Sequence, residues 1–259
     1  MAELICSLEA RVLTIALNRG ERHNALSPAL LGAIRGALDE AAAREDVCVV
    51  VVRGAGMLPF SSGYDMGEIG AHFTPARGRA LQQPIRAVAT AMRALDKPVI
   101  GAAQGFVFGA ALDIFAHCDL RVAAERTHFV LPPAKLGFSY PAEGLARMIE
   151  LLGASRAMEM ALTAEAADAA AMLEWGFLHR VWRAEDFEHD LQRFAATLAA
   201  RAPLSLAALK RTINALSREL SESVVEDSYQ DFARCMGSAD AREGKAAAAE
   251  KRDPDFSGR

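Results

Sequence analysis

The apolar stretch VCVVVV at residues 47–52 constrains the fold more than any other feature of the sequence. It is almost entirely valine, it is far too short to span a membrane, and it ends in Arg53-Gly54. A strand that is apolar at every position has both faces covered, as the central strands of parallel sheets do. We therefore expect an α/β architecture with helices packed on both faces of a sheet.

The neighbouring segments repeat this alternation of strand and helix. Residues 11–17 are apolar and partly β-branched, and Ser27 followed by Pro28 is typical of a helix start. A helical stretch over about 79–95 leads into the strand VIGAA at 99–103. Strands that alternate with helices in this way predict parallel strands.

The character of the chain changes after about residue 145. Alanine- and leucine-rich segments follow one another without a long linker, and their apolar spacing is mostly helical. We expect helices in the segments 145–152, 154–162, 165–175, 186–201, 203–220 and 222–252.

The composition excludes several classes of protein. The 259 residues are 52% hydrophobic and 24% charged, which rules out a disordered or fibrous chain. The formal net charge is −4, whereas nucleic-acid binding usually needs a basic excess, so no nucleic-acid partner is expected. No signal peptide or membrane span is expected either. We expect a cytoplasmic protein whose singly scattered cysteines are reduced, namely Cys6, Cys48, Cys118 and Cys235.

Neither a metal site nor a nucleotide site is predicted. The histidines at 117, 128 and 189 have no partner at metal-ligand spacing, and no HExxH motif is present. Gly54-Ala55-Gly56 follows a strand but lacks the third glycine of a dinucleotide-binding loop.

Two glycine-containing segments can bring backbone N–H groups to a ligand. In PFSSGYDM at 59–66, Gly63 allows a turn that a side chain would hinder. In AAQGFVFGAALD at 102–113, a helix opens at Gly109, where free N–H groups suit a negatively charged oxygen. Taken alone, each segment also fits a structural explanation: a tight loop, and an acid, Asp113, that favours a first helical turn.

A third segment, LPPAKLGFSYPAEGLARM at 131–148, carries Tyr140 and Glu143. Glu143 alone would be taken as an ordinary carboxylate near a helix N-terminus. The segment gains a functional interpretation only beside the other two.

Together these segments resemble the crotonase (enoyl-CoA hydratase/isomerase) superfamily over nearly the whole chain. The family usually has a proline where this chain has Gly20. The matching pieces and their spacing are specific: LNRGERHNAL at 17–26, SSGYDM at 61–66, DKPVIGAAQGFVFGAALD at 96–113, CDLRVAAE at 118–125, LPPAKLG at 131–137, AMEMALTAEAADAAAMLEWGFLHRV at 157–181 and REGKAAAAEKRDPDF at 242–256.

The resemblance implies a crotonase-type spiral of β-β-α turns over residues 1–195 and a helical C-terminal region over 196–259. It implies assembly of the chain into a homotrimer or hexamer through that region. It also implies an enzyme that acts on an acyl-CoA thioester and needs no cofactor, since coenzyme A is part of the substrate.

The resemblance also implies an oxyanion hole made by the backbone N–H groups of Tyr64 and Ala110. Removing a proton next to a thioester carbonyl pushes charge onto its oxygen, which two such donors stabilise. The residues implied in coenzyme A binding are Arg22, His23, Ser62 and Gly63.

Departures from the family pattern bear on the reaction. Hydratases of this family hold a water between two glutamates, which align here with Asp113 and Pro133, so that pair looks broken. Glu143-Gly144 resembles the pair that carries the single catalytic glutamate of enoyl-CoA isomerases. A double-bond shift needs only one carboxylate, so we expect an isomerase with Glu143 as base, partly desolvated, and with Asp113 nearby.

Other reactions of the superfamily stay open. The stretch from Pro133 to Tyr140 resembles methylmalonyl-CoA decarboxylases, which gives Tyr140 a catalytic interpretation beside that of a packing residue. Thioester hydrolysis and hydration by Asp113 with Glu143 are further alternatives. A non-enzymatic relative that binds coenzyme A or RNA is the alternative of another class.

Overall fold

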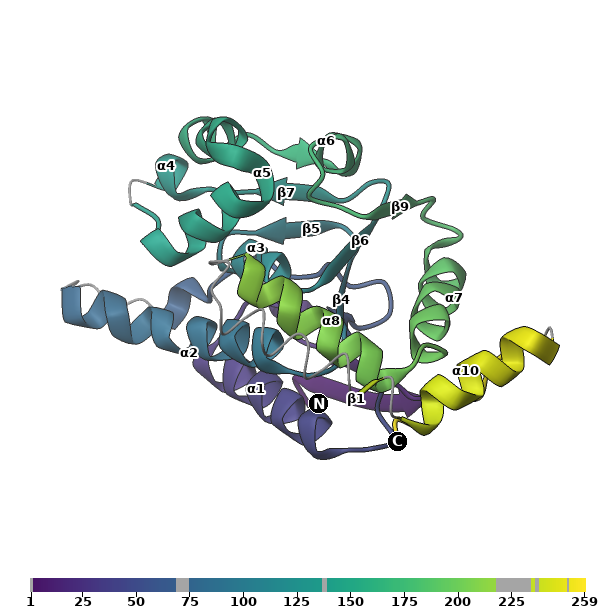
Figure 1. Ribbon diagram of the computed structural model, residues 1–259. Coiled ribbons are helices and arrows are strands. Elements are labelled where there is room, and N and C mark those ends of the chain that lie inside the picture. The colour runs from purple at the N-terminus through teal and green to yellow at the C-terminus, as the bar shows by residue number, and fades with distance from the viewer. Residues whose placement is uncertain (1, 69–74, 137–138, 218–233, 236–237, 251) are drawn as a thin grey trace.

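A computed structural model describes residues 2–68, 75–136, 139–217, 234–235, 238–250 and 252–259. Its main sheet has six strands in the order β1-β2-β3-β4-β6-β9 (Figure 1). β1 and β2 form an antiparallel hairpin, and every other neighbouring pair is parallel. The strands are β1 (Leu4–Glu9), β2 (Val12–Leu17), β3 (Val49–Gly54), β4 (Val99–Ala103), β6 (Leu120–Ala124) and β9 (Arg180–Trp182).

A smaller sheet lies beside the first one. β5 (Phe106–Phe108) pairs in parallel with β7 (His128–Val130), which pairs antiparallel with β8 (Ala167–Asp168). Each strand of the smaller sheet has only two or three residues, which is too short to give a periodic apolar pattern in the sequence. None of the three was predicted as a separate strand.

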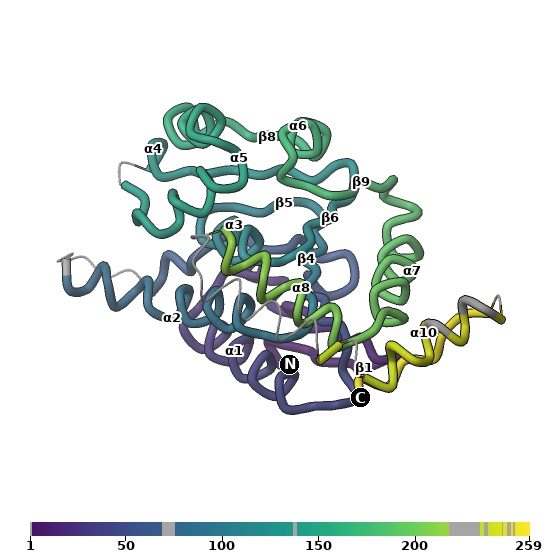
Figure 2. The backbone as a smooth tube through the Cα atoms, in the orientation of Figure 1, coloured from purple at the N-terminus to yellow at the C-terminus, as the bar shows by residue number. Residues whose placement is uncertain are grey.

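Helices cover both faces of the main sheet, as the tube in Figure 2 also shows. α1 and α2 pack side by side on one face, while α7 covers the other. The helices are α1 (Pro28–Ala43), α2 (Pro75–Ala94), α3 (Ala110–Ala116), α4 (Pro133–Leu136), α5 (Ala142–Thr163), α6 (Ala169–Glu174), α7 (Phe187–Ala199), α8 (Pro203–Leu216) and α10 (Ala239–Glu250), with short 3₁₀ helices at Gly20–Arg22 and Met66–Glu68.

β3 confirms the prediction of a strand covered on both faces, two residues further along the chain than expected. All six of its residues are buried. Val50 and Val52 point into the core beneath α1 and α2, and Val49 and Val51 into the core beneath α7. The α/β architecture expected from this stretch is therefore confirmed.

The predicted start of α1 is also confirmed. The Ser27 hydroxyl accepts a hydrogen bond from the N–H of Leu30 at 3.1 Å, and Pro28 is the first helical residue. Leu30, Leu31, Ile34 and Leu38 then form the buried face of the helix.

The C-terminal half agrees with the prediction in part. The helices expected at 145–152 and 154–162 are confirmed as the two stretches of α5, which meet at a kink where Gly153 has non-helical dihedral angles. The expected domain division between 195 and 196 falls inside α7 and stays a prediction. The tail expected to be helical over 222–252 lies partly outside the described residues, and α10 accounts for its described part. In the described part of the chain, no helix has the length and apolar character needed to cross a membrane.

A buried lysine ties α8 to the rest of the fold. Lys210 Nζ lies 2.6 Å from Asp119 Oδ2 and donates to the carbonyls of Met92 and Lys97 at 2.7 and 3.0 Å. Asp119 Oδ2 also accepts the N–H of Val99 at 2.8 Å, at the start of β4. Only 8% of the Lys210 side chain is exposed, so the ammonium depends on these partners for its solvation.

We therefore expect Lys210→Met to lower the free energy of unfolding by about 3–5 kcal/mol, because it leaves the Asp119 carboxylate buried without its cation. Denaturant unfolding of the purified variant measures the change. Arg35→Met is the control: its exposed pair with Asp39 contributes less than about 1 kcal/mol. Equal losses in the two variants would contradict the assigned role.

Candidate active site

The site forms where a loop is held between two other segments. Ser61 pairs with Val107 of β5, and Tyr64 pairs with Leu26, so residues 61–64 lie between them. Leu26 N–H donates to Gly63 O at 2.8 Å, and Asp65 N–H donates to Leu26 O at 3.0 Å. The loops that follow the predicted strands 11–17, 47–52 and 99–103 are thereby brought together.

This pairing directs the N–H of Tyr64. Leu26 forms its two backbone hydrogen bonds with Gly63 and Asp65, the residues before and after Tyr64. In a parallel pair of this register, the N–H of Tyr64 points away from Leu26. It points to the side on which β5 and the start of α3 lie. Ala110 is the first residue of α3, so its N–H has no partner within the helix.

Gly63 allows the close approach between these two segments. Its φ is +95°, and a Cβ atom placed on it would lie 2.6 Å from Phe108 O and 3.5 Å from Ala110 N. Any side chain at this position would therefore push the loop off β5. The structure brings together the two amide-bearing segments that the sequence predicted for the oxyanion hole.

Asp113 is the buried carboxyl group of the site. It lies one turn into α3, and 8% of the residue is exposed. Burial, together with the nearby charge of Glu143, raises its pKa to about 6. Such a group exchanges protons readily near neutral pH.

His117 packs one turn further along α3 and contacts Asp113 twice. Its Nδ1 donates to the Asp113 backbone carbonyl at 2.8 Å and lies 3.5 Å from Asp113 Oδ1. Because a carbonyl only accepts, Nδ1 carries the proton and Nε2 is left as an acceptor. Burial lowers the pKa of His117, so the ring is neutral at pH 7.

Tyr140 and Gly144 complete the wall around Asp113. The Tyr140 hydroxyl donates to the carbonyl of Gly109 at 3.0 Å. A Cβ atom on Gly144 would lie 2.5 Å from the Tyr140 ring and 3.2 Å from Asp113 Oδ2. Burial raises the pKa of Tyr140 well above its usual value, so the phenol keeps its proton.

Glu143 does not have the predicted environment. Its side chain is 57% exposed and pairs with Arg86, with 3.2 Å between Glu143 Oε1 and Arg86 Nη1. The expectation of a partly desolvated base at this position is therefore wrong. Glu143 lies in the first turn of α5 on its solvent side, and the buried carboxylate of the site is Asp113.

Asp113, His117 and Glu143 nevertheless line one cleft, which has a volume of about 530 Å³. Its walls come from α2, α3, α5 and α8, which lie near one another in Figure 1. The other residues that line it are Arg86, Ala89, Thr90, Arg93, Ala94, Arg211, Asn214 and Ala215.

The residues expected to contact coenzyme A lie beside the predicted oxyanion hole. Arg22 and His23 are exposed, and the His23 carbonyl accepts the N–H of Ser62 at 3.0 Å. Gly63 N–H is satisfied by the Ser61 hydroxyl at 3.1 Å. The four predicted residues, Arg22, His23, Ser62 and Gly63, are thus neighbours, and their role in binding stays a prediction.

A largely buried ion pair fixes this loop cluster. Arg19 Nη1 lies 2.7 Å from Asp65 Oδ2 and holds the pKa of that carboxyl group below its usual value. Asn24, which is fully buried, accepts the N–H of Arg19 and donates to Pro59 O, both at 2.7 Å. These bonds fix the orientation of the loop that carries Tyr64.

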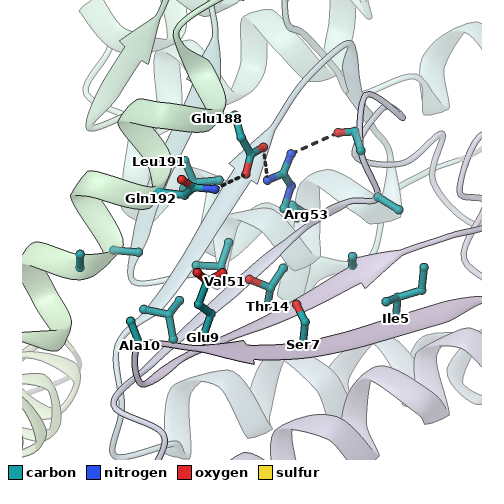
Figure 3. Close-up of a pocket in the computed structure, with 16 residues that line it drawn as sticks. Ile5, Ser7, Glu9, Ala10, Thr14, Val51, Arg53, Glu188, Leu191 and Gln192 are labelled. Carbon is teal, nitrogen blue, oxygen red and sulfur yellow. Dashed lines mark hydrogen bonds and ion pairs between the residues drawn. The ribbon is translucent and has the colours of Figure 1, made fainter.

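A second cavity, of about 540 Å³, lies on the other face of the main sheet, between β1–β3 and α7 (Figure 3). The buried guanidinium of Arg53 lines this cavity. Its Nη1 donates to Glu188 Oε2 at 2.6 Å, and its Nη2 donates to Gly56 O at 3.1 Å. None of the predicted site residues lines this cavity.

Within the described residues, no group of three or more histidine, cysteine, aspartate or glutamate side chains could hold a metal ion.

Sequence reasoning missed His117 and the arginines of the cleft. His117 was considered only as a metal ligand, yet its spacing of four residues from Asp113 places both on one helical face. Arg86, Arg93 and Arg211 carry no motif, and only the packing of α2 and α8 brings them to the cleft.

Comparisons with known proteins identify the family of the chain. The model of the family described as enoyl-CoA hydratase/isomerase matches residues 7–259. The chain is 32% identical over 260 residues to 2,3-dehydroadipyl-CoA hydratase of Escherichia coli K12, with all of both chains covered. It is 34% identical over 225 residues to carnitinyl-CoA dehydratase of Escherichia coli O157:H7, with 82% of each chain covered.

Solved structures show the same fold. The enoyl-CoA hydratase of Bacillus anthracis superposes with a TM-score of 0.93 at 27% identity and covers 100% of both chains. An enoyl-CoA hydratase/carnithine racemase of Magnetospirillum magneticum superposes with a TM-score of 0.92 at 27% identity and covers 100% of this chain and 97% of its own. The predicted crotonase-type fold is confirmed.

Asp113 is expected to lower the stability of the fold. Its pKa of about 6 in the folded protein exceeds the ordinary value of 3.8, so folding favours the protonated form. The free energy of unfolding therefore falls as the pH rises from 4 to 6, by roughly 3 kcal/mol in total. Asp113→Asn should remove most of this loss and raise the unfolding free energy at pH 7.

Denaturant unfolding at pH 4 and pH 7 measures this effect. Asp39→Asn, at an exposed position on α1, is the control and should change the unfolding free energy little at either pH. A variant Asp113→Asn that is less stable than the parent at pH 7 would contradict the expectation.

Proposed function

Because the chain belongs to the enoyl-CoA hydratase/isomerase family, we propose that it shifts a double bond in an enoyl-CoA thioester and that Asp113 carries the proton. The thioester oxygen would accept hydrogen bonds from the N–H groups of Tyr64 and Ala110. Asp113 would remove a proton from C2 and return it at C4. This moves the base from Glu143, where the sequence placed it, to the buried carboxylate.

The observation that carries this proposal is the burial of Asp113 beside the start of α3. Its pKa of about 6 leaves most of the carboxylate ionised at pH 7 while keeping the conjugate acid within reach. Ala110 lies three residues earlier, on the same face of the helix. One base next to one oxyanion hole is sufficient for a double-bond shift.

The backbone donors would supply much of the rate enhancement. Proton removal from C2 forms an enolate, and loss of one fixed donor to such an oxyanion typically costs about 3–4 kcal/mol in the barrier. These donors are insensitive to the side chain, so Tyr64 and Ala110 can occupy their positions without loss of an N–H. Tyr140 would act as a positioning residue, since its hydroxyl holds Gly109 in front of Ala110.

The substrate's coenzyme A would lie along Arg22, His23, Ser62 and Gly63. The proposed reaction moves one proton from C2 to C4 and the π electron pair from C3–C4 to C2–C3, without net oxidation or group transfer, so it needs no further cofactor. Cytoplasmic localisation stays a prediction.

Replacing each carboxylate separately tests the assignment. We expect Asp113→Asn to reduce kcat for 3-enoyl-CoA conversion by about 100-fold or more, because it removes the proton carrier. Glu143→Gln should retain activity within about tenfold, because the Glu143 side chain is 57% exposed and paired with Arg86. The reverse order of effects would return the role of base to Glu143.

The pH dependence offers an independent measurement. Asp113 must be ionised to accept the C2 proton, so kcat should fall on acidification with a midpoint near pH 6. A profile that is flat between pH 5 and pH 8 would reject Asp113 as the base. Thioester binding without turnover of any enoyl-CoA would favour a non-enzymatic relative.

Hydration is the second candidate reaction. Asp113 and Glu143 line the same cleft, and two relatives of the chain are named as a hydratase and a dehydratase. Two carboxylates in different environments can serve as acid and base. Pro133 stands where the second glutamate of the family's hydratases aligns, which disfavours this reaction.

We therefore expect hydration of a trans-2-enoyl-CoA to be at least about tenfold slower than the double-bond shift. Product analysis of the two substrates by mass spectrometry measures both rates. Faster hydration that is lost in both Asp113→Asn and Glu143→Gln would establish the paired-carboxylate reaction instead.

We also propose that the chain assembles into a homotrimer or hexamer. The segment predicted to be helical over 203–220 carries leucine and isoleucine residues spaced three or four apart, and three of them on α8 are exposed: Leu209 at 60%, Ile213 at 63% and Leu216 at 45%. Leu220, the next residue at this spacing, lies outside the described residues. An exposed apolar row of this kind is typical of surfaces buried by another subunit.

Light scattering at micromolar concentration should return a mass of three or six chains. Ile213→Lys should dissociate the assembly, because a charge at the exposed centre of the row cannot be buried at low cost. Arg44→Gln, which removes an exposed charge outside the apolar row of α8, is the matched surface control. A stable monomer in the unaltered protein would reject the assembly.

A further inference from the structure

His117 directly follows the last residue of α3 and lies four residues after Asp113, the proposed base. Both side chains are largely enclosed, with 14% of the His117 side chain and 10% of the Asp113 side chain exposed. A polar ring in such a position costs free energy unless its nitrogen atoms have partners. The contacts of the ring therefore show what holds it in place.

Side chains complete the hydrogen bonding at the end of α3. The N–H of His117 donates to Ile114 O at 3.1 Å, rather than to the carbonyl of Asp113 four residues earlier. The His117 ring supplies the missing donor, because its Nδ1–H reaches Asp113 O at 2.8 Å. Arg147 of α5 serves Ala116 O in the same way, through its Nε at 2.9 Å. Carbonyl groups at a helix end need such partners, so the ring has a defined orientation.

The same ring nitrogen faces one oxygen of the Asp113 carboxyl group. Nδ1 lies 3.5 Å from Oδ1, which is longer than a hydrogen bond, so the Nδ1–H acts there as a nearby dipole. The positive end of that dipole favours the ionised carboxylate, and more strongly in a poorly solvated site than in water. The ring itself is uncharged, because burial lowers the pKa of His117.

The other oxygen of this carboxyl group has an apolar neighbour. A Cβ atom on Gly144 would lie 3.2 Å from Asp113 Oδ2 and 2.5 Å from the Tyr140 ring, so the aromatic ring closes that side. Packing of this kind sets the position of a carboxyl group but does not distinguish its two oxygen atoms. The Nδ1–H of His117 does distinguish them, because it favours the rotation that places one oxygen beside it.

We propose that His117 is a positioning residue for the proposed base: its Nδ1–H, fixed at the end of α3, sets the rotation of the Asp113 carboxyl group through Oδ1. The inference rests on the proposed function, in which Asp113 carries a proton from C2 to C4. That proton must leave and return along defined directions, since small misplacements of reacting groups reduce rates strongly. His117 thus contributes to turnover through Asp113, without taking the proton itself.

Neighbouring charges also act on this pair. The charged and titratable side chains that face it are Arg86 and Arg93 from α2, Tyr140 before α5, Glu143, Arg147 and Glu150 from α5, and Arg211 from α8. All of them are present in each variant compared below. A difference between those variants therefore reports on the side chain at position 117.

Three substitutions of His117 test the role. His117→Phe and His117→Gln lack a donor at the place of Nδ1, whereas the amide nitrogen of His117→Asn returns one, because it is equally many bonds from Cα. In the first two variants we expect the plateau kcat for 3-enoyl-CoA to fall by about tenfold, with KM changed by less than about threefold. The acid midpoint near pH 6 should rise by about 0.5 pH unit. His117→Asn should restore both kcat and the midpoint.

The matched control is His189→Phe, the same change at an exposed position of α7, which covers the other face of the main sheet. It should alter neither kcat nor the midpoint. The Gln and Asn variants both keep a polar side chain at position 117, so their comparison decides the matter even if His117→Phe does not fold. Unchanged kcat in His117→Gln overturns the proposal, and so does an equal loss in His117→Asn, which would assign the effect to packing.

A titration without substrate separates this inference from the proposed reaction. The carboxyl ¹³C signal of Asp113, assigned by its loss in Asp113→Asn, is followed by NMR between pH 4 and pH 8. Its midpoint should rise by about 0.5 pH unit in His117→Gln and stay in place in His117→Asn. If the unaltered protein turns over no enoyl-CoA, the proposed function fails, while this shift still supports the positioning of the carboxyl group by His117. A midpoint that is the same in all variants overturns it, even if the double-bond shift is confirmed.

Discussion

The site depends on one close approach, that of the Gly63 backbone to the end of β5 and the start of α3. A Cβ atom at Gly63 would lie 2.6 Å from Phe108 O, so the contact exists only because this residue has none. The approach aligns two loops from distant parts of the sequence, one carrying Tyr64 and the other Ala110. The Arg19–Asp65 pair and the buried amide of Asn24 then hold the first loop in register.

Local sequence patterns were sufficient to predict the helices and strands whose position is set by the residues within them. β3 is apolar throughout because both faces are covered, and α1 begins where Ser27 can cap it. The strands β5, β7 and β8 could not be predicted in this way, since two or three residues carry no period. They form because the main sheet and α3 hold them next to one another.

The site residues show a similar division. The backbone donors belong to glycine-containing turns that are visible in the sequence, and the structure brings both turns together. Which carboxylate is buried could not be predicted, because burial depends on neighbours from other elements. Asp113 is enclosed by Tyr140 and Gly144 from the region of α5, whereas Glu143, one residue before Gly144, faces Arg86 at the surface.

The carboxylate and the oxyanion hole are mechanically coupled through Tyr140. Its ring fills the space that a side chain at position 144 would occupy, next to Asp113 Oδ2. Its hydroxyl bonds to the carbonyl of Gly109, whose φ of +53° sets the direction of the next amide, that of Ala110. A shift of the ring would therefore move the proposed base and the proposed oxyanion donor together. The phenol keeps this role only while it is protonated, and the burial that raises its pKa ensures that at neutral pH.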